Sequence, residues 1–195
     1  MKIVILNRDG TINALGSDDY VASPDDWVAL PGALEAISRL NRAGWHVVVA
    51  SNQPGLGRGM IDMATFNAIH AKMHRQLAAV GARVEAVFFC PHAPEDACAC
   101  RKPAPGLFVQ IGARFGVPMA SVHAAGNAMR HVRAAAAAGC RTHLLMTGKS
   151  EHLRGRLGQG SDADLAALAP DVPPGTHAHE DLGAFADWLL AQPTT

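Results

Sequence analysis

Short apolar runs alternate with helix-forming stretches along most of the chain, and this alternation is the strongest constraint on the fold. The apolar runs predict strands at residues 2–6, 46–50, 84–89, 122–125 and 142–145. Helical periodicity and end signals predict helices at residues 32–43, 63–80, 105–116, 129–138 and 181–192, and residues 147–160 are typical of a polar loop. Strands separated by helices form a mainly parallel sheet covered on both faces. We therefore predict an α/β three-layer sandwich.

Length and charge limit the classes of protein. The chain has 195 residues, which suits one domain (1–195), and no insertion is long enough for a separate cap domain. Its 17 basic and 17 acidic residues give no broad electrostatic field for nucleic acid or a membrane surface. The first apolar run is too short for a signal peptide, and no segment is apolar over a membrane span. These features predict a cytoplasmic protein, and we expect a monomer.

The first predicted strand runs into the sequence Asn7-Arg8-Asp9-Gly10-Thr11. Open α/β sheets bind ligands at this end of their strands. Two acids with one residue between them can divide the work of phosphoryl transfer. One attacks phosphorus, and the other transfers the proton of the leaving group. Asp9 is the second of these acids, whereas an amide, Asn7, stands where the nucleophile belongs. A plain strand-to-loop turn favoured by Gly10 is the alternative interpretation.

Polar and basic residues follow two further predicted elements. Ser51 and Asn52 end the second strand, and their hydroxyl and amide groups suit the non-bridging oxygens of a phosphate. Arg101 and Lys102 precede a helix that begins at a proline, and we interpret Lys102 as phosphate-directed and Arg101 as substrate-directed. A turn and an exposed basic pair are the respective alternatives.

Three of the four cysteines fall within eleven positions, together with a histidine. The four side chains are Cys90, His92, Cys98 and Cys100. Three thiolates and an imidazole predict a tetrahedral zinc site, whereas the alternative is free buried cysteines. Because protein would fill all four ligand positions, we expect a structural ion that staples the loop.

The fourth predicted strand ends in a stretch that lacks the expected acids. A magnesium-dependent enzyme of this layout needs an aspartate at position 127 and commonly a second acid at position 131, and the chain has Asn127 and His131. A capped turn is the default interpretation of Gly126-Asn127. We interpret His131 as a surface histidine; the alternative is a charge beside the pocket below a pKa of about 6.5.

Together these motifs resemble the haloacid dehalogenase-like phosphatases, and most closely the D-glycero-D-manno-heptose 1,7-bisphosphate phosphatases with their relatives among histidinol phosphatases. The resemblance spans about residues 1–145, and its most specific part is the cysteine loop that runs into Arg-Lys-Pro. It implies a haloacid dehalogenase-like, Rossmann-like fold and an aspartyl-phosphate intermediate at position 7. It also implies acid/base work at Asp9, phosphoryl contacts from Ser51 and Lys102, and sugar or second-phosphate recognition near Arg58 and Arg101.

The resemblance further implies Mg²⁺ at positions 7 and 127 and the Asp9 carbonyl, and zinc at the Cys3His set. The chain departs from the family at Asn7, Asn127 and His131, where aspartates are expected. A neutral amide does not readily form an acyl phosphate, and Mg²⁺ is normally bound through carboxylates. The amides therefore argue against a phosphorylated intermediate and against a bound Mg²⁺. Losing two carboxylates together with one dication leaves the local charge unchanged, which would let a metal-free pocket accept a phosphate ester.

We therefore expect a sugar-phosphate phosphatase of the heptose bisphosphate type whose hydrolysis is very weak or absent. One alternative is a non-catalytic or regulatory protein that senses a phosphorylated sugar or docks onto an active partner enzyme. A second alternative is histidinol phosphate as the ligand. An active phosphatase that uses another route and an enzyme disabled on purpose also stay open.

Overall fold

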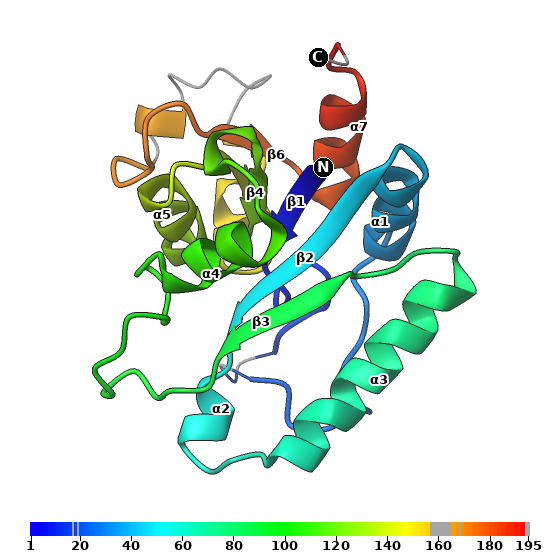
Figure 1. Ribbon diagram of the computed structural model, residues 1–195, viewed down its shortest axis with the longest axis vertical. Coiled ribbons are helices and arrows are strands. Elements are labelled where there is room, and N and C mark those ends of the chain that lie inside the picture. The colour runs from blue at the N-terminus through cyan, green and yellow to red at the C-terminus, as the bar shows by residue number, and fades with distance from the viewer. Residues whose placement is uncertain (17, 19, 157–164, 168, 194–195) are drawn as a thin grey trace.

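The computed structural model describes residues 1–16, 18, 20–156, 165–167 and 169–193, and its centre is a parallel sheet (Figure 1). The six strands of the described residues lie in the order β3-β2-β1-β4-β5-β6, and every pairing is parallel. The strands are β1 (Lys2–Leu6), β2 (Trp45–Asn52), β3 (Ala86–Cys90), β4 (His123–Gly126), β5 (Arg141–Leu145) and β6 (His177–His179). The predicted position of the second strand beside the first is confirmed.

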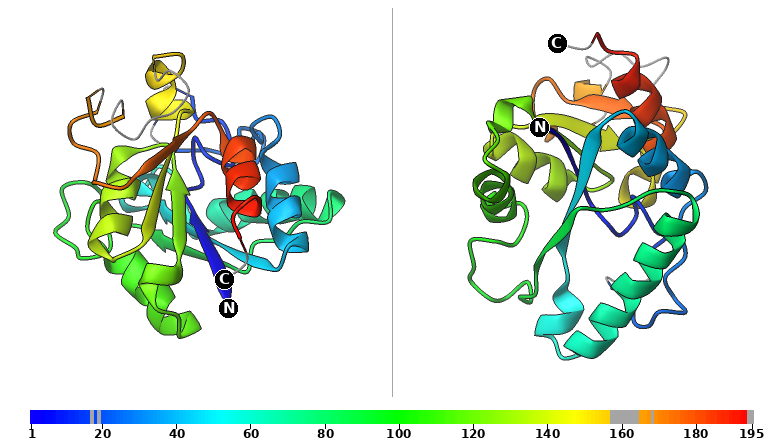
Figure 2. Two further views of the ribbon diagram at one scale, coloured as in Figure 1. Left: turned by 90° about the horizontal axis from the view of Figure 1, so that it is seen from above. Right: turned by 45° about the vertical axis from the view of Figure 1, so that its right-hand side comes forward.

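Helices cover both faces of this sheet. One face packs against α1 (Ala33–Arg42), α3 (Met63–Ala79) and α7 (Leu182–Leu190), and the other packs against α4 (Gly106–Phe115) and α5 (Met129–Ala137) (Figures 1 and 2). The shorter helical elements are α2 (Pro54–Gly57), η1 (Met119–Ser121) and η2 (Gly148–Leu153). The predicted three-layer α/β sandwich is confirmed.

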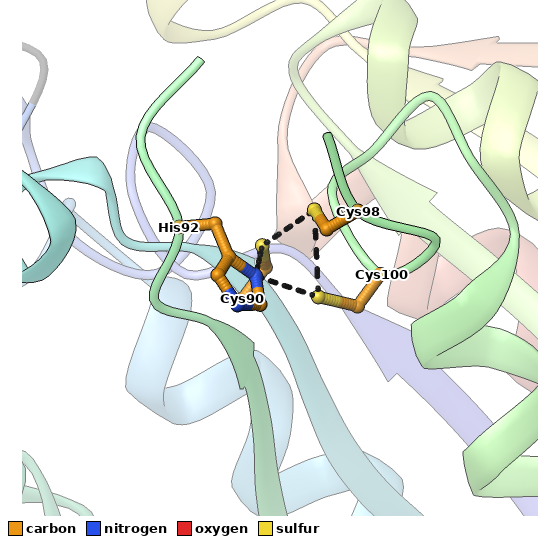
Figure 3. Close-up of side chains that lie close together, drawn as sticks. All are labelled: Cys90, His92, Cys98 and Cys100. Atoms are coloured by element: carbon orange, nitrogen blue, oxygen red, sulfur yellow. Dashed lines mark hydrogen bonds between the residues drawn. The ribbon is translucent and has the colours of Figure 1, made fainter. Parts of the chain in front are cut away.

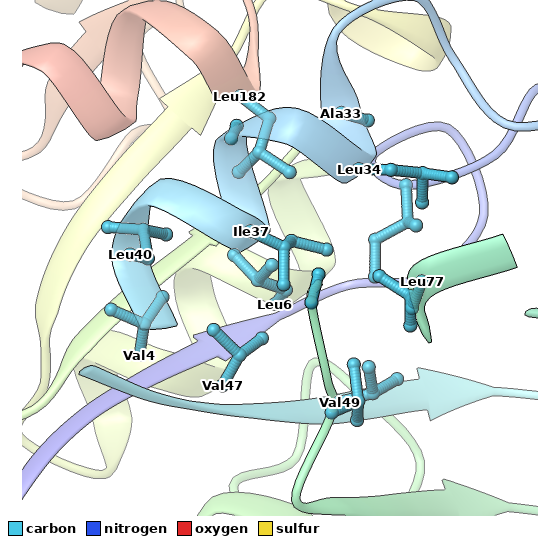
Figure 4. Close-up of a cluster of buried hydrophobic side chains, with 14 of the residues drawn as sticks. Val4, Leu6, Ala33, Leu34, Ile37, Leu40, Val47, Val49, Leu77 and Leu182 are labelled. Atoms are coloured by element: carbon cyan, nitrogen blue, oxygen red, sulfur yellow. The ribbon is translucent and has the colours of Figure 1, made fainter. Parts of the chain in front are cut away.

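The strand sequences are apolar on both faces because both faces are covered. Side chains alternate along a strand, so Val4 and Leu6 of β1 pack with α1 (Figure 4). Ile3 and Ile5 point to the opposite face and pack with α4 and α5. Ile37 of α1 is fully buried against the first of these sets. Burial of each such side chain contributes about 1.5–3 kcal/mol to the free energy of folding. The packed sheet is therefore a stable base for the polar residues at its edge.

Capping residues fix the helix ends where the sequence predicts them. The carboxylate of Asp62 accepts a hydrogen bond from the Thr65 N–H at 2.7 Å and begins α3. Asp181 accepts from the Ala184 N–H at 2.8 Å and begins α7 in the same way. Side-chain oxygens at these positions satisfy backbone donors that have no partner within the helix.

The structure also contains elements that were not predicted. β6 and α2 are absent from the predicted set, and η2 lies within the segment predicted as a polar loop, of which residues 157–160 fall outside the described residues. β3 begins at Ala86 rather than at residue 84. Among the described residues, no helix combines the length and the apolar character that a bilayer crossing requires.

Candidate functional site

The carboxyl end of β1 places Asn7 and Asp9 in the middle of the sheet, between β2 and β4. The Asn7 N–H donates to the Ala125 carbonyl of β4 at 3.1 Å, and the chain then turns sharply. Gly10 has a φ of 79°, and a Cβ there would overlap the Asn127 side chain. Only glycine therefore lets this turn lie against the end of β4.

The Asn7 amide is held by hydrogen bonds at both ends. Its nitrogen, Nδ2, donates to the Asp9 carbonyl at 2.7 Å and to Asn127 Oδ1 at 2.9 Å. Its oxygen, Oδ1, accepts from Lys102 Nζ at 2.8 Å. The family resemblance assigns three ligand positions to Mg²⁺, and two of them, the Asp9 carbonyl and Asn127, therefore accept the N–H groups of the Asn7 amide.

The Asn127 side chain is buried at the end of β4, where it contacts the turn after β1. Its amide oxygen lies 3.0 Å from Thr11 Oγ1, and the Asn127 N–H donates to the same hydroxyl at 3.2 Å. If the amide is turned through 180°, its nitrogen reaches the Asp9 carbonyl at 2.9 Å and its oxygen accepts from the Lys149 N–H at 3.2 Å. In that orientation Asn127 no longer accepts from Asn7 Nδ2, but the bond from Asn7 Nδ2 to the Asp9 carbonyl is unchanged.

Lys102 reaches the same network from the loop before α4, and only 2% of it is exposed. Besides Asn7, its ammonium contacts the Ala50 carbonyl at 2.6 Å and His131 Nδ1 at 3.0 Å. The Asn52 amide holds the Lys102 backbone, accepting from its N–H at 3.0 Å and donating to its carbonyl at 3.1 Å. Burial lowers the pKa of Lys102 well below its usual 10.5, and the nearby charge of Arg130 adds to this effect.

The interpretation of His131 as a surface histidine is wrong. The residue is fully buried in α5, with its ring 5.2 Å from the ring of Phe108 and its Nδ1 facing Lys102. Burial, followed by the charge of Lys102, lowers the pKa of His131 well below 6.5. His131 is therefore neutral near pH 7 and adds no positive charge to the site.

The carboxylate of Asp9 is paired with the neighbouring Arg8, which is fully buried. Arg8 Nε and Nη2 donate to the two carboxylate oxygens at 2.8 and 3.2 Å. The Asn13 and Gln53 amides each add a hydrogen bond of 3.1 Å. Burial raises the pKa of Asp9, but the charge and hydrogen bonds of Arg8, with those of the two amides, bring it below 3.8. Asp9 is therefore ionised at neutral pH.

The sequence reasoning assigned no role to Arg8, whose remaining donors reach distant segments. Nη2 contacts Gln53 Oε1 at 3.2 Å, and Nη1 lies 3.3 Å from His70 Nε2. His70 Nδ1 donates to the Phe66 carbonyl at 2.9 Å, so Nε2 accepts from Arg8. Burial and the charge of Arg8 lower the pKa of His70 to about 4. The sequence signal for Arg8 was its place between the two motif positions, directly before an acid.

The residues predicted to bind phosphate divide into two groups. Ser51, Asn52 and Lys102 are buried at the strand ends near Asn7, and Ser51 Oγ accepts from the Gln53 amide at 2.7 Å. Arg58 is exposed at the carboxyl end of α2, and Arg101 lies on the loop after β3, where its Nη1 is 3.5 Å from the His92 carbonyl. The first group forms the floor of the site, and the two arginines lie on the segments beside it.

The donor set around Asn7 does not fit Mg²⁺. The ion prefers oxygen ligands that include carboxylates, whereas here an amide nitrogen faces the Asp9 carbonyl and Asn127, and the Asn7 oxygen faces Lys102. The carboxylate of Asp9 is directed to Arg8 instead. A cation at this point would have to displace the hydrogen bonds of Asn7.

The predicted zinc ligands come together after β3, and their geometry fits the ion (Figure 3). Cys98 Sγ lies 3.7 Å from Cys90 Sγ and 3.8 Å from Cys100 Sγ. His92 Nδ1 lies 3.4 Å from Cys90 Sγ and 3.3 Å from Cys100 Sγ. A tetrahedron with Zn–S bonds of about 2.3 Å separates its sulfur atoms by about 3.8 Å, so these positions match a Cys3His site.

Comparison with known proteins identifies the family. Residues 2–140 match the polynucleotide kinase 3 phosphatase family. The D-glycero-β-D-manno-heptose-1,7-bisphosphate 7-phosphatase of Bordetella bronchiseptica is 50% identical over 192 residues, which cover 98% of this chain and 99% of the relative. The chain belongs to the heptose bisphosphate phosphatases. The Pseudomonas aeruginosa member of this family is 40% identical over 189 residues, 97% of this chain and 98% of the relative.

Solved structures agree with this assignment. The crystal structure of D,D-heptose 1,7-bisphosphate phosphatase from B. bronchiseptica, complexed with magnesium and phosphate, matches with a TM-score of 0.86 and 49% identity. It covers 97% of this chain and 98% of the other. L-2-haloacid dehalogenase from Xanthobacter autotrophicus matches with a TM-score of 0.61 at 12% identity over 99% of this chain and 100% of the other, which shows a shared haloacid dehalogenase-like fold.

Proposed function

We propose that this heptose bisphosphate phosphatase family member binds a phosphorylated sugar at the ends of β1 and β2 and hydrolyses it very weakly or not at all. The observation that carries the proposal is the Asn7 amide, whose nitrogen bonds to the Asp9 carbonyl and to Asn127. The relative from B. bronchiseptica was crystallised with magnesium and phosphate, whereas the donor set of this chain does not fit Mg²⁺.

The chemical argument begins with the attacking group. A carboxylate attacks phosphorus with a charged oxygen, whereas the oxygen of Asn7 is neutral, its lone pair is delocalised, and it already accepts from Lys102 at 2.8 Å. Asp9 cannot take over this task while both of its oxygens are bonded to Arg8. The step that would form a covalent phosphoryl-enzyme therefore lacks a suitable nucleophile.

Binding of the substrate does not depend on that nucleophile. Lys102 offers Nζ donors, Ser51 a hydroxyl and Asn52 an amide at the same edge of the sheet, and the cations of Arg58 and Arg101 lie on the segments beside it. Charge-assisted hydrogen bonds of this kind are strong for phosphate oxygens. The retained donors favour a second candidate function, the sensing of a phosphorylated sugar without turnover.

The zinc loop is assigned a structural role. Zinc at Cys90, His92, Cys98 and Cys100 would fix the loop that carries Arg101 and Lys102, with no open position for water. Gly106 lies so close to this loop that a Cβ would overlap the Ala99 carbonyl. Thiolate ligands require reduced cysteines, so we infer a reducing compartment such as the cytoplasm.

Phosphate release from heptose 1,7-bisphosphate in the presence of Mg²⁺ tests the loss of hydrolysis. The unmodified chain is expected to match an Asn7→Ala variant, because neither has a nucleophile at position 7. Turnover by the unmodified chain in the ordinary range of about 1–1000 per second, lost in Asn7→Ala, would refute the proposal.

Calorimetry on the unmodified chain tests binding separately. Heptose bisphosphate and inorganic phosphate are expected to bind with or without Mg²⁺, and Lys102→Met is expected to weaken binding by about tenfold or more. Histidinol phosphate belongs in the same panel, since the sequence does not separate the two ligands. The absence of heat with every phosphate would remove the sensing function.

A further inference from the structure

A cavity of about 890 Å³ lies at the amino edge of the sheet, opposite to the reaction centre. The first residues of five strands line it, and they are Lys2, Trp45, His123, Arg141 and His177. α7 closes one side through Trp188. Figure 2 shows the start of β1 beside α7, and the reaction centre begins where β1 ends. A strand of this length separates the two sites by roughly 16 Å, so the cavity is distinct from the family's phosphate site.

The lining of the cavity is basic. Its two cations are Lys2 and Arg141, and no aspartate or glutamate lines it among the described residues. Arg141 donates from Nε to the Ala120 carbonyl at 3.2 Å, and Lys2 Nζ lies 5.7 Å from the centre of the Trp45 ring. Neither cation forms an ion pair with a carboxylate in the part of the chain that the structure describes. The cavity therefore favours a negatively charged ligand.

Aromatic rings form the walls. Trp45 and Trp188 are both half-buried, and the His123 ring lies 5.5 Å from the first and 6.1 Å from the second. His177 lies 4.9 Å from Trp188 at an interplanar angle of 37°. Indole rings that remain partly exposed inside a cavity offer flat surfaces on which another ring can stack. The walls therefore select for a planar group.

A line of buried imidazoles leads into the cavity. His123 Nδ1 lies 2.9 Å from His143 Nε2, and His143 Nδ1 lies 3.0 Å from His179 Nε2. In a line of neutral imidazoles each ring donates from one nitrogen and accepts at the other. If the protons run from His179 towards His123, then Nε2 of His123 carries an N–H. In the opposite direction Nε2 of His123 is an acceptor, so either order gives the cavity a polar nitrogen without burying a charge.

We propose that this cavity is a second small-molecule site and that it binds a compact anion carrying a flat aromatic ring. Its volume lies within the usual range of small-molecule sites, about 300–1000 Å³. The anionic group would contact Arg141 and Lys2, and the ring would stack between Trp45 and Trp188. An aromatic carboxylate and a nucleoside monophosphate share this chemistry.

Calorimetry with four probes on the full chain tests the proposal. Benzoate and adenosine monophosphate combine a ring with a charge, cyclohexanecarboxylate lacks the aromatic ring, and benzamide lacks the charge. At least one aromatic anion is expected to saturate with a Kd below about 1 mM, and the other two probes are expected to bind about tenfold more weakly. Comparison of the Kd of benzoate with that of adenosine monophosphate decides whether the site prefers an aromatic carboxylate or a nucleoside monophosphate.

Three variants locate the binding. Arg141→Gln is expected to weaken it by about tenfold, because it removes a charge-assisted hydrogen bond at an exposed position that the fold tolerates. Arg114→Gln, exposed on α4, and Ser51→Ala, in the reaction centre, are expected to bind benzoate as the unmodified chain does, whereas adenosine monophosphate held by the reaction centre would be weakened by Ser51→Ala. The proposal is overturned if neither aromatic anion saturates by about 10 mM, or if Ser51→Ala weakens binding while Arg141→Gln does not.

Discussion

The family resemblance implies a metal ion both in the reaction centre and in the zinc loop, and the residues of this chain fit the two ions differently. In the zinc loop, all four ligand atoms lie within 4.8 Å of one another and match a tetrahedral ion. In the reaction centre, Asn7 and Asn127 bond to each other at 2.9 Å, and an amide nitrogen faces the Asp9 carbonyl. The two sites adjoin the same loop, since Lys102 follows the last cysteine ligand by two residues.

The two sites differ in what a metal ion would contribute, which is folding in the zinc loop and chemistry in the reaction centre. The Cys3His site organises a loop with little core of its own, so its loss would affect folding. In the reaction centre, amides stand where the resemblance implies carboxylates, and hydrogen bonds satisfy these buried positions. The chemistry of a site can therefore change while the elements that support it remain.

The largest expected effect comes from restoring the acids. The combined variant Asn7→Asp, Asn127→Asp, His131→Asp is expected to gain Mg²⁺-dependent phosphatase activity by about 1000-fold or more, because it regains a nucleophile and two carboxylate ligands. Phosphate release with and without chelator measures the gain. A matched variant that restores only Asn127→Asp is expected to stay inactive. If the combined variant gained nothing, the pocket would differ from the family beyond these three residues.

The next effect concerns the charge buried in the reaction centre. Arg8→Met is expected to destabilise the fold by about 3–5 kcal/mol, because it leaves the Asp9 carboxylate buried without its cation. Arg39→Met is the control, since its ion pair with Asp187 is partly exposed and worth about 0–1 kcal/mol. Denaturant titration compares the two variants, and equal losses would mean that the Arg8–Asp9 pair contributes little.

The zinc loop supplies the third comparison. Cys98→Ser is expected to lower zinc affinity by about 100-fold or more, because it removes one of the four ligands. Cys140→Ser is the control, since Cys140 lies outside the loop. Chelator competition with metal analysis measures both variants. Zinc retained equally by the two would contradict a Cys3His site.

The smallest expected effect is a loss of folding stability at acidic pH. It arises from His70, which contacts Arg8 of the reaction centre. Burial and Arg8 lower the folded pKa of His70 to about 4 from 6.5, so the unfolded chain takes up the proton first. The free energy of unfolding that neutral His70 contributes is complete above pH 6.5. It is lost as the pH falls towards 4, at up to about 1.4 kcal/mol per pH unit.

Unfolding titrations with zinc present test this effect between pH 7 and pH 5. His70→Gln is expected to show a shallower loss than the unmodified chain, whereas His152→Asn, at an exposed position, is expected to match it. An unchanged slope in His70→Gln would show that another group dominates the acid response.

The sequence was sufficient for much of the fold. The run at residues 2–6 predicted β1 because parallel strands covered on both faces are continuously apolar, and Asp62 predicted the start of α3 because its cap is local. β6 was missed because its three residues include two histidines and no apolar run. α2 was missed because Pro54–Gly57 is typical of a turn.

The candidate site was predicted in part. The zinc ligands lie close together in the chain, so their spacing alone indicated the site. His131 contacts Lys102, and Arg8 contacts Gln53 and His70, and each of these partners is distant in sequence. No local pattern records such contacts, since they arise when separate strands end at the same edge of the sheet.

The central claim is that the amide at position 7 cannot become phosphorylated. Acid-quenched mass spectrometry of the unmodified chain, incubated with heptose 1,7-bisphosphate and Mg²⁺, tests it directly, and the restored triple variant is the positive control. We expect no phosphoryl adduct on the peptide that contains Asn7, and a trapped adduct in the control. A phosphoryl group on Asn7 of the unmodified chain would contradict it.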